Sequence, residues 1–288
     1  MNELFKLYYY ELIKNKNKFI VLVGISLAII LFSIVFTYGQ ENKYMIFSEV
    51  ENIVKISQNS KDINSAFLNE FLDASKLTFE NYLGFKSKIL MELFLITAIA
   101  MSFDVVTRNY KKKSNSFYID TNLPVSIYKI KFSRLLVSIS IYVVASLILM
   151  TMILSVNYVL SVMFNTVYKA DLRYVLDAFT LPSLVKLTFM YPISTVSIYI
   201  SGCIMIIQSL ASIIFIDKGK NIIIKKITYF ILIAFLIIFM LFFLLVGDIN
   251  PTYMNSKLVV FNIVFLSVSI SLFLVDCKLT EKRLREVA

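Results

Sequence analysis

Long, uninterrupted apolar runs constrain this chain more than any other feature. Several runs of about twenty residues carry almost no charge, as in Phe19–Tyr38 and Ile227–Val246. The hydrocarbon core of a bilayer is about 30 Å thick, so roughly 20 helical residues cross it. A soluble domain of 288 residues has no core large enough to hide such runs. The sequence therefore predicts an all-α polytopic membrane protein.

Six such runs predict six transmembrane helices in a single domain over residues 19–288. Their expected bounds are about 19–38, 89–106, 131–162, 187–216, 227–246 and 257–276. Pro192 is expected to kink the fourth span, because proline removes a backbone donor. Helical spacing places Ser194, Ser197 and Ser201 on one face of that span. A face of small residues permits close helix packing or lines a cavity.

The distribution of basic residues predicts the orientation of the chain. Nineteen Lys and Arg residues lie in the N-terminus, around segment 107–130, in the turn before the fifth span and in the tail, against ten in the other, longer connections. Because Lys and Arg accumulate on the cytoplasmic side, both termini and segment 107–130 are expected there, and segment 39–88 outside. The net charge of +10 then reflects membrane flanks, which argues against a nucleic-acid partner.

Residues 1–18 are expected to form an amphipathic helix at the membrane surface. The predicted apolar face holds Leu4, Phe5, Tyr8, Leu12 and Ile13, and the predicted polar face holds Glu3, Lys6, Glu11 and Lys14. This pattern is typical of a helix that lies in the plane of the membrane. The alternative is a basic flank that only sets orientation. Segment 39–88 contains two stretches with helical spacing, so it is either a small helical cap or a solvated loop.

Two acids lie at the ends of the second span. Glu92 is expected to pair with Lys88, and Asp104 with Arg108, because residues four apart are neighbours on a helix. Intramembrane acids are otherwise candidates for function. The polar candidates for a translocation pathway are Asn157, Ser197, Ser201 and Gln208.

No motif in the sequence predicts catalysis, a bound cofactor or a metal. The chain has no histidine, and its two cysteines are too few for a zinc site. It also contains no Gly-rich phosphate loop and no Gly-x-Ser-x-Gly nucleophile motif. An intramembrane enzyme would need clustered acids or a Ser/Lys pair at membrane depth, and none is evident. Any ATP chemistry is therefore expected from another chain.

The stretch 104–136, DVVTRNYKKKSNSFYIDTNLPVSIYKIKFSRLL, combines features of a docking surface. Asp104 and Arg108 close the second span, and a small apolar patch follows at Phe117 and Tyr118. Pro124 makes a rigid turn. Asn122 or Ser126 is placed to cap the next helix, which carries Tyr128, and Arg134 is expected to reach the lipid headgroups.

These residues resemble the membrane subunit of type-two ABC exporters. The resemblance rests on the N-terminal elbow helix, the acid-to-arginine element Asp104–Arg108, the turn Leu123-Pro-Val-Ser126, and Arg134 followed by two leucines. The layout covers the whole chain, while the motifs cover some thirty residues. The segment between Arg108 and Pro124 departs from the family, because it holds lysines and serines where members often carry Gly, Thr and a Leu run.

The resemblance implies a machine of several chains. Two membrane subunits, identical or different, enclose the pathway, and two ATPase subunits bind ATP and Mg²⁺ beneath them. Loop 107–130 acts as the coupling element. The residues to which the resemblance assigns coupling are Asp104, Arg108, Phe117, Tyr118, Pro124, Ser126, Tyr128 and Arg134.

The cargo is expected to be a peptide or an antimicrobial compound, exported across the cytoplasmic membrane of a bacterium. The predicted pathway carries few charges, which suits a hydrophobic or amphipathic cargo, and the Asn, Ile and Lys bias is typical of low-GC bacteria. Export of drugs or lipids by the same machinery is the nearest alternative. A membrane channel or scaffold is a further alternative, although no selectivity-filter loop is visible.

Overall fold

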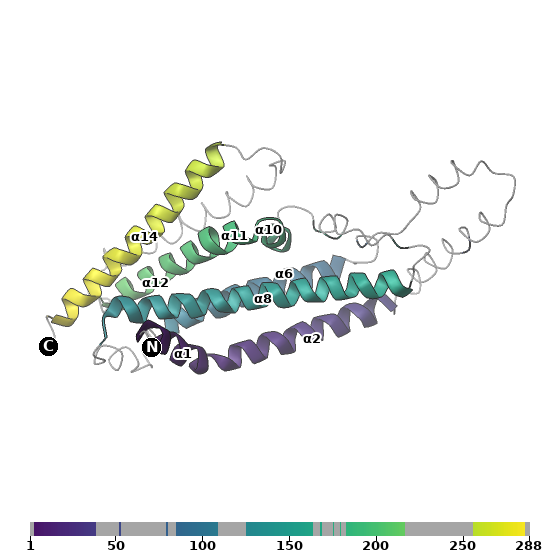
Figure 1. The fold of residues 1–288 in the computed structure, drawn as a ribbon, viewed down its shortest axis with the longest axis horizontal. Coiled ribbons are helices and arrows are strands. Elements are labelled where there is room, and N and C mark those ends of the chain that lie inside the picture. Colours follow the sequence, from purple (N-terminus) through teal and green to yellow (C-terminus); the bar gives the residue numbers. More distant parts are fainter. Residues whose placement is uncertain are drawn as a thin grey trace. The chain divides into compact units, whose positions relative to one another are not determined.

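The computed structural model describes residues 3–38, 85–108, 125–163, 183–216 and 256–285, together with residues 52, 79, 168, 175 and 179. These residues are almost entirely helical and form no β-strand among themselves (Figure 1). The long helices are α2 (Lys16–Tyr38), α6 (Phe85–Thr107), α8 (Ile127–Met163) and α14 (Ser256–Arg285), and α1 (Glu3–Lys14) precedes them. The predicted all-helical fold is confirmed for this part of the chain.

Among the described residues, four helical segments are long and apolar enough to cross a membrane. They are Ser87–Thr107, Ile127–Val162, Pro192–Ile213 and Asn262–Lys282. A fifth follows if α1 and the start of α2, which are bent by 51° at their junction, count as one span. Several long apolar helices make this a multi-pass membrane protein. The predicted span 227–246, and most of segments 39–88 and 107–130, lie outside the described residues.

The fourth predicted span is divided in two, which corrects the expected kink at Pro192. Helix α10 (Leu184–Met190) ends before Tyr191, whose backbone leaves the helical region at φ −132° and ψ 57°. A new helix then begins with Pro192 in its first turn. Proline is favoured in the first turn of a helix, because the N–H groups there have no acceptor within the helix and the absence of one costs no hydrogen bond. The chain continues through α11 (Pro192–Ser194), the π-helix η2 (Thr195–Ile200) and α12 (Ser201–Ile216).

The last helix continues beyond the predicted end of the final span. The sequence predicts that this span ends near Asp276, and α14 continues to Arg285. Asp276 is buried and paired with Lys131, so its charge is compensated within the protein.

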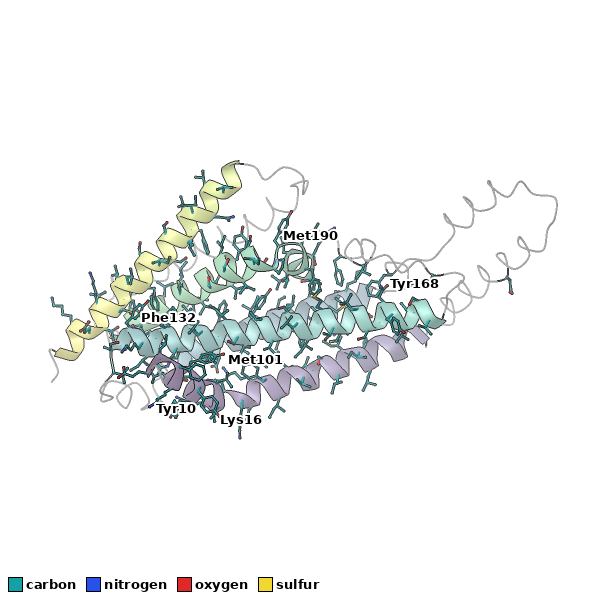
Figure 2. The ribbon with its side chains drawn as sticks, viewed as in Figure 1. Tyr10, Lys16, Met101, Phe132, Tyr168 and Met190 are labelled. Carbon is teal, nitrogen blue, oxygen red and sulfur yellow. The ribbon has the colours of Figure 1, made fainter. Side chains whose placement is uncertain are left out.

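The chain divides into two compact units. The first holds Met1–Val21, Leu95–Ala145 and Met190–Ala288, and the second holds Leu22–Phe94 and Ser146–Phe189. In the first unit α12 packs along α14, and a hydrophobic cluster forms there from Cys203, Ile206, Leu210 and Phe265. Aromatic side chains also link α8 to α14, since Tyr128 stacks on Phe132 and meets the edge of Phe273 (Figure 2 labels Phe132).

Close packing of α12 against α14 requires a glycine at position 202. A Cβ atom there would lie 2.4 Å from Cε1 of Phe265 and 3.0 Å from Oγ of Ser269. Because Phe265 belongs to the buried cluster, its ring has little room to move. Of the two predicted roles for small residues in this span, close packing therefore applies at Gly202.

We predict that Gly202→Ala destabilises the protein by about 1–3 kcal/mol through overpacking. The free energy of unfolding in detergent micelles measures this loss. Gly24→Ala is the matched control, because a Cβ at Gly24 meets nothing within 4 Å. The control should be neutral or stabilising, since alanine favours helices over glycine. Equal effects of the two variants would contradict the packing role of Gly202.

Candidate functional site

A buried ion pair joins α1 to α8. Arg134 donates from Nε to Oε1 of Glu11 at 3.1 Å, and the two side chains are 3% and 7% exposed. The sequence placed Glu11 on the polar face and Arg134 at the headgroups, and both expectations were wrong. The face of α1 that packs on the bundle holds the acid, while Phe5, Tyr9, Tyr10 and Ile13 remain exposed (Figure 2 labels Tyr10).

Three further contacts join α1 and the start of α2 to α6 and α8. Lys18 donates to Oδ2 of Asp104 at 2.9 Å and to the carbonyl of Met101 at 3.0 Å, so it holds the last turns of α6 (Figure 2 labels Met101). The hydroxyls of Tyr8 and Ser140 are hydrogen-bonded at 3.0 Å. Sequence spacing predicted a partner for Asp104 only on its own helix, and so missed Lys18.

An exposed pair completes the contact between α1 and α8. Lys129 donates to Oε2 of Glu3 at 2.7 Å. The hydrogen bond from Lys129, followed by its charge, holds the pKa of Glu3 below its usual range. Both side chains face water, so this pair contributes little to stability compared with the buried one.

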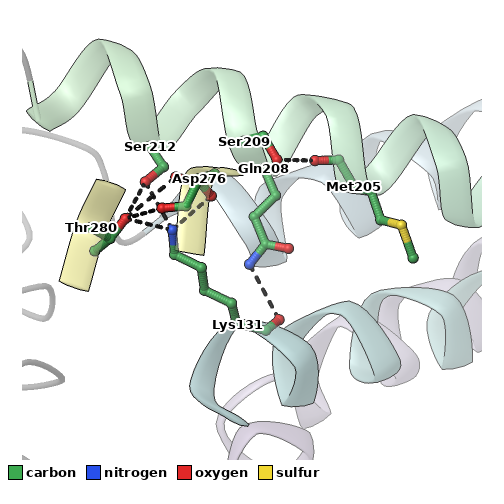
Figure 3. A network of polar contacts seen from close by, with 7 residues as sticks. All are labelled: Lys131, Met205, Gln208, Ser209, Ser212, Asp276 and Thr280. Carbon is green, nitrogen blue, oxygen red and sulfur yellow. Dashed lines mark hydrogen bonds and ion pairs between the residues drawn. The ribbon is translucent and has the colours of Figure 1, made fainter. Parts of the chain in front are cut away.

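A second buried ion pair joins α8 to α12 and α14 (Figure 3). The ammonium of Lys131 lies 2.6 Å from Oδ2 of Asp276, and these side chains are 3% and 0% exposed. The same ammonium donates to Oγ1 of Thr280 at 2.8 Å and to Oγ of Ser212 at 3.1 Å. Ser212 and Thr280 are also within 3.3 Å of each other, so the four polar groups form one network.

Gln208 extends this network by one helical turn. Its Nε2 donates to the backbone carbonyl of Lys131 at 3.2 Å, and its side chain is fully buried. Its Oε1 has no hydrogen-bond partner among the described residues. We call the set Gln208, Ser212, Asp276 and Thr280 the Lys131 site.

The predicted coupling residues lie on two helix ends. Asp104 and Arg108 are at the end of α6, and Ser126 directly precedes α8, where its carbonyl accepts from the N–H of Ile130. Tyr128 is exposed in the first turn of α8. Phe117, Tyr118 and Pro124 lie outside the described residues. Helices α6 and α8 are the two that flank segment 109–124.

The predicted pathway residues differ in burial and in their hydrogen bonds. In the second unit, Asn157 is buried and accepts a hydrogen bond from the hydroxyl of Tyr168. In the first unit Ser197 is exposed and Ser201 is buried, and each hydroxyl bonds to its own helix. The expectation of one serine face assumed a regular α-helix. It was wrong because η2 is a wider π-helical turn, which shifts the register between these residues.

Glu92 positions the start of α10 within the second unit. Its carboxylate accepts from the N–H groups of Leu184 at 3.0 Å and Val185 at 3.3 Å, and from the hydroxyl of Ser183. A carboxylate at a helix N-terminus satisfies free N–H groups and favours the helix dipole. This capping role was not visible in the sequence, where only the nearby Lys88 indicated a partner.

Sequence analysis missed the acids and bases that pair across long separations. One signal was available: Lys131 and Asp276 both lie within or beside apolar runs, where a charge needs a partner. No group of three or more metal-binding side chains occurs among the residues that the structure describes. Cys203 and Cys277 are buried and free.

Comparison of the chain with models of known protein families, with curated proteins and with solved structures found no match.

Proposed function

We propose that this chain is the membrane subunit of a type-two ABC exporter in a bacterial cytoplasmic membrane. It has six spans and cytoplasmic termini in this proposal, and α1 is the elbow helix at the inner membrane surface. The 51° bend after α1 and the exposed apolar side chains of that helix support an in-plane position. A separate ATPase binds ATP and Mg²⁺, and this chain is not itself an enzyme.

One observation carries the proposal: the consecutive N-terminal helices α1 and α2 are tied by ion pairs to the two helices that flank the predicted coupling loop. Lys18, at the start of α2, holds the end of α6, and Glu11 of α1 holds the start of α8 through Arg134. A push on the loop from an ATPase would therefore move α1, α6 and α8 together. A buried pair transmits such a force because separating its charges in a low-dielectric environment is costly.

The cargo in this proposal is a peptide or an antimicrobial compound with amphipathic or hydrophobic character. The apolar character of the predicted spans, which carry few charges, supports such a cargo. Export of a drug or a lipid by the same machinery is the alternative. A second membrane subunit, identical or related, completes the pathway.

The first experiment is purification of the chain from its native membrane in mild detergent, with quantitative identification of the bound proteins. We expect one ATPase copy per copy of this chain, and an ATPase activity that a candidate cargo peptide stimulates. Recovery of the chain without any nucleotide-binding partner would overturn the exporter proposal in favour of a channel or scaffold.

The coupling role makes a second prediction. Replacing both Pro124 and Tyr128 with glycine should abolish transport and the stimulation of the ATPase, because the loop loses its rigid turn and its exposed aromatic contact. ATP-dependent uptake into inverted vesicles measures transport. Tyr158→Gly is the matched control, since Tyr158 is an exposed tyrosine elsewhere on α8. Full transport by the double variant at normal expression would contradict the assignment of residues 107–130 as the coupling loop.

A further inference from the structure

The Lys131 site binds an ammonium group with full hydrogen bonding (Figure 3). A lysine ammonium has three donor hydrogens. Asp276, Thr280 and Ser212 supply three acceptors at 2.6, 2.8 and 3.1 Å. The carboxylate also balances the charge. Helices α12 and α14 thus provide a complete site for one primary ammonium group.

The same helices contact the other end of the lysine residue. Gln208 donates to the backbone carbonyl of Lys131, so the site recognises both the side-chain amine and the peptide group. Its Oε1, fully buried, accepts no hydrogen bond from any described residue. The N–H of Lys131 does not fill this role, because within α8 it points to the carbonyl four residues earlier.

A primary amide can bond to both the N–H and the C=O of one extended residue, which point to the same side of the chain, since it donates to a C=O and accepts from an N–H. An extended peptide presents both groups, whereas a helical residue such as Lys131 presents only its carbonyl. The free acceptor on Gln208 is therefore explained if the natural ligand is a lysine residue in a non-helical peptide. Lys131 fits the same site but leaves one buried acceptor unsatisfied, which is unfavourable.

We propose that the Lys131 site is a recognition site for a lysine residue of a peptide ligand, and that Lys131 occupies it in this conformation as an internal substitute. The assignment of that ligand as cargo rests on the proposed export function. Lys131 lies in the second turn of α8, next to the predicted coupling loop. Movement of that helix end would withdraw Lys131, and the buried carboxylate of Asp276 would then favour capture of another ammonium.

The test uses the full chain in lipid nanodiscs with Lys131→Ala, and Nα-acetyl-lysine N-methylamide as the probe. We expect saturable binding by calorimetry and a rise in the thermal midpoint, whereas the norleucine counterpart gives neither. Adding Asp276→Asn should weaken binding at least tenfold. The carbonyl of residue 131 still accepts from Nε2 of Gln208 in this variant, so only Oε1 is free for the probe, and adding Gln208→Leu should weaken binding about fivefold, the effect of one hydrogen bond. Binding of n-butylammonium, which lacks a peptide group, should not respond to Gln208→Leu.

Equal binding of the lysine and norleucine probes, or no binding to a folded Lys131→Ala protein, would overturn the proposal. If that variant does not fold, the wild-type chain is tested with a lysine-bearing peptide that carries a photoreactive group beside the lysine. Labelling is expected within 201–216 and should fall at least tenfold when the lysine is acetylated. Labelling elsewhere, no labelling, or labelling that ignores acetylation overturns the proposal.

These measurements do not involve an ATPase, so the two proposals fail separately. Lysine binding without any ATPase partner would refute export and leave the site. An ATPase partner whose activity responds equally to lysine-bearing and acetylated peptides, with no lysine binding by the variant, would refute the site and leave export.

Discussion

Replacing Asp276 with alanine should cost about 3–5 kcal/mol of stability, because it leaves the buried ammonium of Lys131 without its counter-charge. The two remaining acceptors, Ser212 and Thr280, are neutral hydroxyls that do not balance a full charge. Such a loss is a large part of the total stability of an ordinary domain. Denaturant titration in detergent micelles, with helicity as the signal, measures the free energy of unfolding.

The matched control removes both charges. The double variant Lys131→Met/Asp276→Leu should recover most of the stability, since apolar side chains of similar volume replace a buried pair at little cost. The two sites are in direct contact, so their effects should be strongly non-additive. If the double variant is as unstable as Asp276→Ala alone, the cost arises from lost packing at position 276 and not from an uncompensated charge.

Glu11→Ala should release α1 from the bundle and destabilise the protein by about 3–5 kcal/mol. Arg134 is only 2% exposed, so the loss of Glu11 removes the carboxylate that balances the charge of a buried guanidinium. We expect faster tryptic cleavage at Lys14 and Lys16, which lie at the junction of α1 and α2. Cleavage rate and the free energy of unfolding are both measured in the same detergent.

Two variants separate the effect of charge from that of the helix itself. Glu3→Ala removes an acid of the same helix whose ion pair is exposed, and it should change stability and cleavage little. The exchange Glu11→Arg/Arg134→Glu should restore part of the lost stability, because it rebuilds the pair with reversed polarity. If the Glu11→Ala variant keeps the wild-type cleavage rate and free energy of unfolding, apolar contacts alone hold α1 on the bundle.

Several elements of the fold follow from local pattern. The second span was predicted at 89–106 and the apolar segment runs Ser87–Thr107, while the third was predicted at 131–162 and runs Ile127–Val162. Ser126 directly precedes α8, and its backbone carbonyl accepts from the N–H of Ile130. These features are predictable because the apolar length needed to cross a bilayer and the caps of a helix depend on residues close in sequence.

The sequence did not predict the partners that lie far along the chain. Helical spacing predicted Arg108 for Asp104 and Lys88 for Glu92, but it did not indicate Lys18 or the N-terminus of α10 as further partners. The prediction that the serines share one face was wrong for another reason. The π-helical turn at Thr195–Ile200 changes the helical register inside a span that looks regular in sequence.

The sequence by itself determined that the chain is helical, that it crosses a membrane several times, and where most apolar segments begin and end. Only the tertiary structure decided which charges meet: Glu11 with Arg134, and Lys131 with Asp276, across 123 and 145 residues. The physical reason is one of range. Hydrophobic length is a property of each segment, whereas the stability of a buried charge depends on a counter-charge brought close by packing.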